Sequence, residues 1–151
     1  MSLKPALDRL AHQAEETVLL AVRVRDQFMY IEQSPGPHPI RYAVNIGDTR
    51  PLETTAIGRT FLAFEEPAPP QVNAALARRL GEIRRSGYSV NEGEVMSDVH
   101  AIAAPIFSTS QHQPIAVVAV LGPRTRMTDM KKRIWPQLRR TVKDIEEATA
   151  S

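Results

Sequence analysis

The chain has 151 residues, enough for one domain with a single core, and its 42% hydrophobic and 24% charged residues match ordinary globular proteins. Cysteine is absent, which excludes disulfides, thiol nucleophiles and cysteine-ligated zinc, and the formal net charge is only +2. No apolar run approaches the roughly 18 residues of a membrane span and no secretory leader is visible, so we expect a cytoplasmic protein without membrane contact.

The first predicted element is a helix over residues 4–15. Leu7, Leu10, Ala11 and Ala14 recur at steps of three and four residues, which places them on one apolar stripe. The helix starts without a capping residue. We therefore expect the natural chain to continue upstream and residues 1–3 to be a cloning remnant.

Strands are predicted next. Apolar residues alternate over 17–24 and recur over 28–33, and the polar residues between these runs favour a β-hairpin. Residues 34–39 contain three prolines, which lack the N–H that a sheet ladder needs, so a loop is predicted there. Residues 40–44 are predicted to form a third strand, ended by Gly47.

Two helices are expected in the middle of the chain. The hydroxyls of Thr54 and Thr55 can cap a helix over residues 56–64, which a cluster of prolines then ends. The second helix is predicted over residues 71–85, with Gly87 placed to end it in the left-handed conformation.

The remaining elements are an extended segment, a hairpin and a last helix. Residues 88–94 read as extended, and the apolar runs 100–107 and 115–121 flank a polar turn. Thr128 can cap the last helix, and Pro136 inside it should kink the helix or delay its start. Hairpin-linked strands with helices between them predict the α+β class, with a central, largely antiparallel sheet flanked by helices.

Catalytic motifs are absent from the sequence. It has no nucleophile elbow, no glycine-rich phosphate loop and no zinc-binding helix, so we do not expect an enzyme. One polar cluster leaves a metal-dependent enzyme open as an alternative, because carboxylates with a histidine can hold a divalent ion. The same spacing suits the solvated edge of a sheet, which we favour. The cluster consists of Glu92, Glu94, Asp98 and His100.

Basic residues gather towards the end of the chain. Acidic residues share this segment, and aromatic residues are not interleaved with the basic ones. We therefore predict the solvated face of a helix and no direct contact with nucleic acid. The basic residues are Arg124, Arg126, Lys131, Lys132, Arg133, Arg139 and Arg140.

Small apolar residues offer a different kind of site. Their short side chains leave volume above the sheet, which either larger neighbours fill or a pocket occupies. The helix start near Ala56 presents unpaired backbone N–H groups suited to a carboxylate. From composition alone, close packing of a helix on the sheet and a pocket both remain open. The small residues of the two strands are Ala101, Ala103, Ala104, Ala116 and Ala119.

Five segments, in order and at matching spacing across nearly the whole chain, resemble the effector-binding domain of IclR-type transcriptional regulators. The resemblance implies a GAF-like sensor domain that usually follows a DNA-binding winged helix-turn-helix. It implies the end of a linker helix at residues 1–15 and an effector-binding domain at residues 16–151, with the DNA-binding domain absent from this chain. The segments are GDTRPL (47–52), TAIGRTFLAF (55–64), GYSVNEGE (87–94), HAIAAPIF (100–107) and LGPRTRMT (121–128).

The resemblance further implies a site and partners. The effector would be a small organic or aromatic acid, the chain a homodimer or tetramer, and DNA a partner only through the absent domain; no cofactor or metal is implied. Asn91 would hydrogen-bond the effector opposite the N–H groups of Ala56 and Ile57, with little part in folding. The implied pocket residues are Tyr42, Ala56, Ile57, Asn91, Val99, Ala101, Ala119 and Leu121.

Several positions depart from the usual pattern of that family. Asn91 stands where an aspartate is common, which eases the approach of an anion. Glu53 would repel a carboxylate if it points inward. The stretch between Phe64 and Gly87 is about half the usual length. These departures leave a degenerate sensor, acting only as a dimerisation module, as an alternative function.

Overall fold

A computed structural model describes residues 2–65, 72–110 and 112–150. A short 3-10 turn, η1 (Arg124–Arg126), precedes the last helix. The strands are β1 (Thr17–Val24), β2 (Gln27–Ser34), β3 (Thr49–Pro51), β4 (Ser89–Glu92), β5 (Val99–Phe107) and β6 (Pro114–Pro123). The helices are α1 (Lys4–Ala14), α2 (Ala56–Ala63), α3 (Ala74–Ser86) and α4 (Met130–Ala148).

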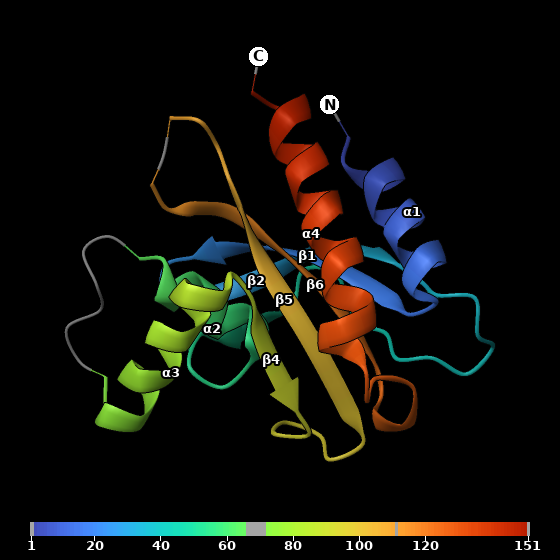
Figure 1. Ribbon diagram of the computed structural model, residues 1–151, viewed down its shortest axis with the longest axis horizontal. Helices are drawn as coiled ribbons and strands as arrows, with labels where there is room; N and C mark the ends of the chain where they lie inside the picture. The colour runs from blue at the N-terminus through green and yellow to red at the C-terminus, as the bar shows by residue number, and fades with distance from the viewer. Residues whose placement is uncertain (1, 66–71, 111, 151) are drawn as a thin grey trace.

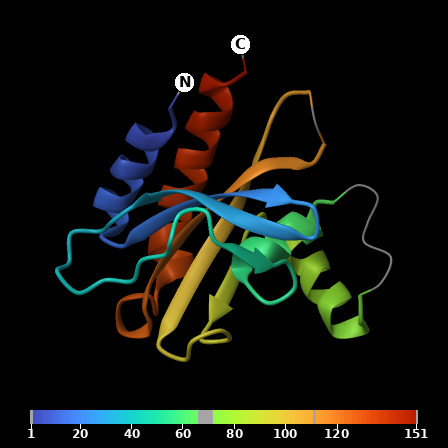
Figure 2. The same cartoon turned by 180° about the vertical axis from the view of Figure 1, so that it is seen from behind.

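One sheet organises these elements. Its strand order is β3-β2-β1-β6-β5-β4, and every neighbouring pair is antiparallel. Helices α1 and α4 lie side by side on one face, and α2 and α3 belong to the other (Figures 1 and 2). The predicted α+β class, with a central antiparallel sheet flanked by helices, is confirmed.

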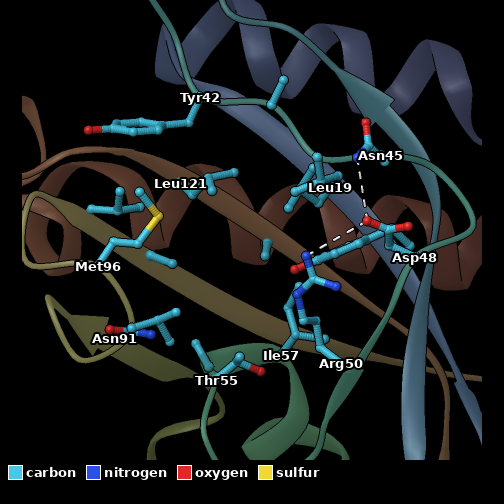
Figure 3. A pocket seen from close by; sticks show the side chains of 18 residues that line it. Leu19, Tyr42, Asn45, Asp48, Arg50, Thr55, Ile57, Asn91, Met96 and Leu121 are labelled. Carbon is cyan, nitrogen blue, oxygen red and sulfur yellow. Dashed lines mark hydrogen bonds and ion pairs between the residues drawn. The ribbon is translucent and has the colours of Figure 1, made fainter.

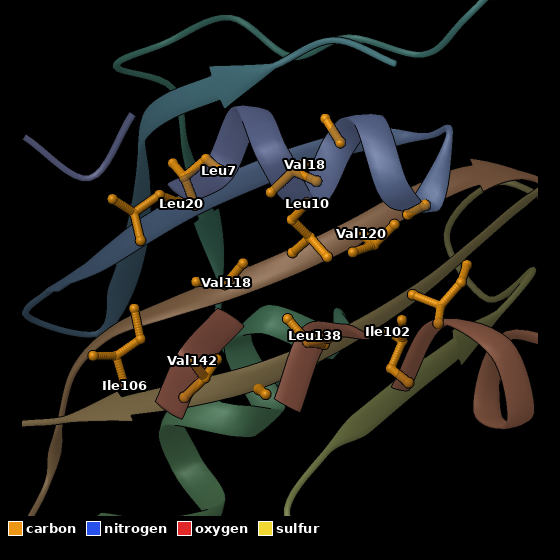
Figure 4. Packing of buried hydrophobic residues seen from close by; sticks show 14 of the residues in the cluster. Leu7, Leu10, Val18, Leu20, Ile102, Ile106, Val118, Val120, Leu138 and Val142 are labelled. Carbon is orange, nitrogen blue, oxygen red and sulfur yellow. The ribbon is translucent and has the colours of Figure 1, made fainter. Parts of the chain in front are cut away.

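Both faces of the sheet are buried. Along β1, Val18 and Leu20 pack towards α1 and α4, whereas Leu19 and Ala21 pack towards α2. Figure 4 shows the first of these two layers, in which Leu138 of α4 meets the sheet. Burial on both faces explains why the central strands are apolar at nearly every position instead of at alternate ones.

Helix α1 forms as predicted and is anchored along its full apolar stripe. Leu7, Leu10, Ala11 and Ala14 are all at most 2% exposed. The helix ends at Glu15, whose backbone is left-handed with φ 58°. Because α1 packs against both α4 and the sheet, it is part of the domain core.

An ion pair with a buried carboxylate and a partly exposed arginine lies just after α1. Glu16 is 2% exposed, and Arg126 of η1 donates to both of its carboxylate oxygens at 2.7 and 2.9 Å. Arg133 donates to the carbonyls of Ala14 and Arg126, each at 3.2 Å. The assignment of Arg126 and Arg133 to a solvated helix face is therefore wrong: these two arginines hold the turn between β6 and α4 against the end of α1.

The prediction of a strand over residues 40–44 is wrong. Ile40 is 89% exposed, and β3 forms later, at Thr49–Pro51. The Gln33 side chain both donates to the carbonyl of Val44 and accepts from its N–H, while Thr17 donates to the carbonyl of Tyr42. Side chains of the β1–β2 hairpin thus satisfy this backbone in place of a ladder.

The two middle helices are confirmed, with shifted ends. Thr55 caps α2 by accepting the N–H of Gly58 at 2.9 Å. Asn73 caps α3 in the same way, so this helix begins at Ala74 and not at residue 71. Gly87 ends α3 with φ 86°, as predicted. The prolines at positions 67, 69 and 70 lie outside the described residues.

The last helix begins at Met130 and runs through Pro136. The expected cap at Thr128 is wrong, because the N-cap residue is Asp129 and it makes no side-chain capping bond. A start delayed to Pro136 is also wrong, because the helix already includes the six residues before the proline. Pro136 removes the N–H that would otherwise bind the carbonyl of Lys132. Within the described ranges no helix is long and apolar enough to cross a membrane.

Alanine substitution at two helical glycines should change the stability of the domain in opposite directions. A Cβ at Gly58 would overlap the carbonyl oxygen of Leu52 and lie 2.5 Å from its Cα, so Gly58→Ala should destabilise by about 1 to 3 kcal/mol through overpacking. A Cβ at Gly81 would meet only the flexible ends of arginine side chains, at 3.4 and 3.6 Å, so Gly81→Ala should stabilise by about 0.5 to 1 kcal/mol through helix propensity.

Urea unfolding of both variants measures these free energies. Equal effects of the two substitutions would contradict the close contact between α2 and the segment before it.

Candidate functional site

A pocket of about 290 Å³ lies between the α2 face of the sheet and the segments 42–50 and 95–96 (Figure 3). Its lining combines an apolar floor with polar groups near the edge. The lining residues are Leu19, Tyr30, Tyr42, Ala43, Val44, Asn45, Asp48, Arg50, Thr55, Ala56, Ile57, Asn91, Val95, Met96, Val99, Ala101, Ala119 and Leu121.

The floor of the pocket follows from strand register. Asn91 of β4 pairs with Ala101 of β5, which in turn pairs with Leu121 of β6. In the next row, Ala119 pairs with Leu19 of β1. Two alanines in adjacent strands leave room above the sheet that larger side chains would occupy, and the start of α2 borders this space instead of filling it.

All eight residues expected from the resemblance line this pocket. The structure brings together Tyr42, Ala56, Ile57, Asn91, Val99, Ala101, Ala119 and Leu121. Sequence reasoning missed the polar group of Asp48 and Arg50, and it missed Met96. Glu53 is exposed and does not belong to the lining, so it places no carboxylate in the pocket.

Asn91 has two roles in the structure. Its side chain is buried at 7% exposure, and its Oδ1 accepts the N–H of Glu94 at 2.8 Å. This bond identifies the oxygen, because only an acceptor can face an N–H. Within the described part of the chain the Nδ2 group donates no hydrogen bond, so it remains available. The expectation that Asn91 has little part in folding is wrong, since it holds the turn after β4.

The first turn of α2 supplies further donors. The Gly58 N–H is taken by the Thr55 cap, whereas the N–H groups of Ala56 and Ile57 stand too early in the helix for an intrahelical acceptor. Both residues line the pocket. The positive end of the helix dipole therefore borders the same space as the Asn91 amide.

Asp48 and Arg50 form a separate polar group of the lining. The Arg50 Nη2 lies 3.8 Å from Asp48 Oδ2, and its guanidinium lies 5.9 Å from the centre of the Tyr30 ring. Burial raises the pKa of Tyr30, so its hydroxyl stays protonated at neutral pH. In Figure 3, Asp48 and Arg50 lie on the opposite side of the view from Asn91 and Met96. Asp48 is the only acidic residue among the described lining residues, and Arg50 offsets its charge.

Glu94 is held outside the pocket by two arginines. Arg59 of α2 donates to it at 3.1 Å, and Arg79 of α3 donates through both terminal nitrogens, one at 2.6 Å. Both arginines also donate to the carbonyl of Val90. The hydrogen bonds from Arg79 and the charge of both arginines lower the pKa of Glu94, while burial and the charge of Arg79 lower the pKa of Arg59.

The four residues of the metal alternative do not converge. Glu92 and His100 are paired across β4 and β5, with Lys131 3.8 Å from Glu92, whereas Glu94 is bound to Arg59 and Arg79. Among the described residues no group of three histidine, aspartate or glutamate side chains is placed to hold a metal ion.

The two-faced antiparallel sheet, with helix pairs on both faces and a pocket beside α2, defines a domain of the GAF-like α+β class. The family model of the bacterial transcriptional regulator IclR C-terminal domain matches residues 1–72 and 71–147. The chain therefore belongs to this family of transcriptional regulators, which are not enzymes, and the resemblance seen in the sequence is confirmed. The two matches meet inside the segment expected to be shortened.

Individual relatives agree with this assignment. The HTH-type transcriptional regulator KipR of Bacillus subtilis is 26% identical over 158 residues, covering 93% of this chain and 62% of KipR. The transcriptional repressor IclR of Escherichia coli is 27% identical over 146 residues, covering 83% of this chain and 52% of the repressor. The chain thus spans about half to three fifths of the length of these relatives.

Solved structures show the same fold. An IclR family transcriptional regulator from Brucella abortus superposes with a TM-score of 0.82 at 26% identity, over 97% of this chain and 61% of that one. The Thermotoga maritima IclR gives a TM-score of 0.84 at 24% identity, over 98% of this chain and 67% of that one.

The pairing of Glu94 predicts a pH-dependent contribution to stability. Its folded pKa lies below the usual value of 4.5, so the contribution is complete above pH 4.5 and is lost as the pH falls through the lower folded pKa. Glu94→Gln, which cannot ionise, should therefore be less stable than the unmodified chain at pH 7. The difference in unfolding free energy, measured by urea titration at several pH values, should shrink below pH 4.5. A difference that stays constant down to the lowest pH at which the chain folds would contradict the ion pair.

Proposed function

We propose that this chain is the small-molecule-sensing domain of an IclR-type transcriptional regulator, and that its effector is a small organic or aromatic acid. The observation that carries the proposal is the pocket of about 290 Å³ above Ala101 and Ala119. Its volume suits a compact molecule, and its floor is apolar apart from Asn91. We assign effector contact to the eight predicted residues of the lining.

The polar groups support an acid oriented in one direction. The Nδ2 group of Asn91 and the N–H groups of Ala56 and Ile57 are donors without acceptors in the described chain, and a carboxylate satisfies several donors at once. Leu19 and Leu121 would contact the apolar part of the molecule. An acid bound in this orientation has its charge away from Asp48.

Regulation would proceed by population shift. In the longer protein that we propose, residues 1–15 are the end of a linker from a DNA-binding domain outside this chain, and this end packs as α1 onto the sensor formed by residues 16–151. An effector that binds one arrangement of a homodimer or tetramer better than another changes the spacing of the DNA-binding domains. The HTH-type name of the relative KipR supports DNA binding by such a protein, which would act in the cytoplasm.

The second candidate is a sensor that has lost its ligand and serves only in assembly. The segment between Phe64 and Gly87, which we expect to be shorter than usual in the family, favours it. The open space above Ala101 and Ala119 speaks against it, because an unused pocket is expected to fill with larger side chains.

A panel of aliphatic and aromatic carboxylic acids tests the sensing proposal by thermal shift and calorimetry. An acid present at 100 times its Kd stabilises the domain by about 2.7 kcal/mol, which raises the Tm of a chain of this size by roughly 5 to 10 °C. If no acid in the panel changes the Tm, the assembly candidate replaces the sensor.

The charge of the effector can be tested at position 91. Asn91→Asp keeps an oxygen for the N–H of Glu94 but replaces the free donor with negative charge. Benzoate binding, measured by calorimetry, should weaken by about 1 to 3 kcal/mol, while binding of the neutral amide benzamide should change less. Asn91→Leu is a poorer probe because it also removes the bond to Glu94. Equal losses for benzoate and benzamide would place the charged end of the acid elsewhere.

A further inference from the structure

We propose that Glu94 is the positioning residue of the pocket: through Arg59 and Arg79 it fixes the wall segment 93–98 and thereby sets the shape and affinity of the site. The effect on ligand affinity rests on the proposed ligand-sensing function. The positioning of segment 93–98 depends only on the contacts of Glu94.

Glu94 stands next to the pocket wall but faces two helices. Its carboxylate points away from the pocket to α2 and α3, whereas the next two residues, Val95 and Met96, line the pocket. Both are largely exposed, at 60% and 56%, so burial of their side chains contributes little to holding them. The position of this wall must come from polar contacts on either side of it.

Those contacts converge on one short stretch. Arg59 and Arg79 hold the carbonyl of Val90 before Asn91 and the carboxylate of Glu94 after it. Asn91 itself accepts the N–H of Glu94 at 2.8 Å. The pocket residue Asn91 is therefore fixed from both sides by the same two guanidinium groups.

The far end of the wall is held by backbone bonds. Gly93 donates to the carbonyl of Val99 at 3.2 Å, and Val99 donates to that of Met96 at 3.0 Å. These bonds close the turn, and the N–H of Arg124 donates to the carbonyl of Asp98 at 2.7 Å, which ties the end of the wall to η1 but not to α2 or α3. The attachment to α2 and α3 passes through Glu94.

Charge makes Glu94 hard to replace. Arg59 is 3% exposed, and its Nε has no partner within the described structure. Glu94 is the one carboxylate that Arg59 contacts among the described residues, and it is shared with Arg79. Removing its charge leaves the buried guanidinium of Arg59 next to that of Arg79 without a carboxylate partner of its own, which favours movement of the wall.

Methionine-methyl NMR tests the proposal without any ligand. The chain has five methionines; Met96 reports on the wall, while Met127 and Met130, at 0% and 3% exposure, report on the α4 side of the core. Glu94→Gln should move and narrow the Met96 methyl signal and leave those of Met127 and Met130 in place. Glu92→Gln is the matched control, since this exposed carboxylate two residues earlier lies 3.8 Å from Lys131 and makes no ion pair with Arg59 or Arg79 in the described structure.

A second pair of variants probes the same link from α3. Arg79→Met should reproduce the shift of Met96, and the exposed neighbour Arg78→Met should not. The double variant Glu94→Gln/Arg79→Met should shift Met96 no further than the larger single change, because the two side chains act through one interaction. An unchanged Met96 signal in Glu94→Gln, an equal shift in Glu92→Gln, or additive shifts in the double variant would each overturn the proposal.

Benzoate calorimetry tests the consequence for binding. If the released wall is in its binding position one tenth of the time, the Kd for benzoate rises about tenfold in Glu94→Gln and stays unchanged in Glu92→Gln. If Glu94→Gln shifts the Met96 methyl signal but leaves the Kd for benzoate unchanged, the proposal that Glu94 sets the affinity of the pocket is overturned. Failure of the unmodified chain to bind benzoate or any other acid of the panel would instead overturn the acid-sensing function, while the Met96 signal still decides the role of Glu94.

Discussion

The domain depends on the burial of one sheet on both of its faces. Neither layer of helices could stand alone, because the apolar stripes of its helices need the sheet for cover. The two helix layers differ in how fully they cover their faces of the sheet. On the α4 side, large buried residues such as Ile102, Ile106 and Leu138 pack together, whereas on the α2 side the alanines at 101 and 119 border an open pocket. The packed layer lies on the other face of the strands that form the floor of the pocket.

Much of the fold could be predicted from local patterns. The stripe of α1, the two hairpins, the Thr55 cap and Gly87 are each specified by residues within a few positions of one another, so periodicity and capping rules found them. The segment 40–44 could not be predicted in this way. Its apolar residues resemble a strand, but Gln33 and Thr17, far away in sequence, hold its backbone through side chains.

The residues of the pocket floor could be predicted from the sequence, whereas those of its walls could not. Strand register brings Asn91, Ala101 and Leu121 into one row, and the family pattern marks the same positions. Asp48, Arg50 and Met96 lie in connections between elements, where no periodicity shows which side chains turn inward. The partners of Glu94 were missed for a related reason: Arg59 of α2 and Arg79 of α3 lie 35 and 15 residues before it in the sequence, and no local pattern pairs them with it.

The buried Glu16 links three positions of the sequence into one unit. A Cβ at Gly122 would lie 2.6 Å from a carboxylate oxygen of Glu16, so residue 122 has no side chain because residue 16 needs that space for its pair with Arg126. A shorter side chain at residue 16 would free the space but leave the guanidinium of Arg126 without its carboxylate partner. A side chain at residue 122 would displace the carboxylate of Glu16 from its position. In any set of homologues, these three positions should covary: glycine at 122 should accompany the ion pair, and a larger residue there should accompany its joint loss at 16 and 126.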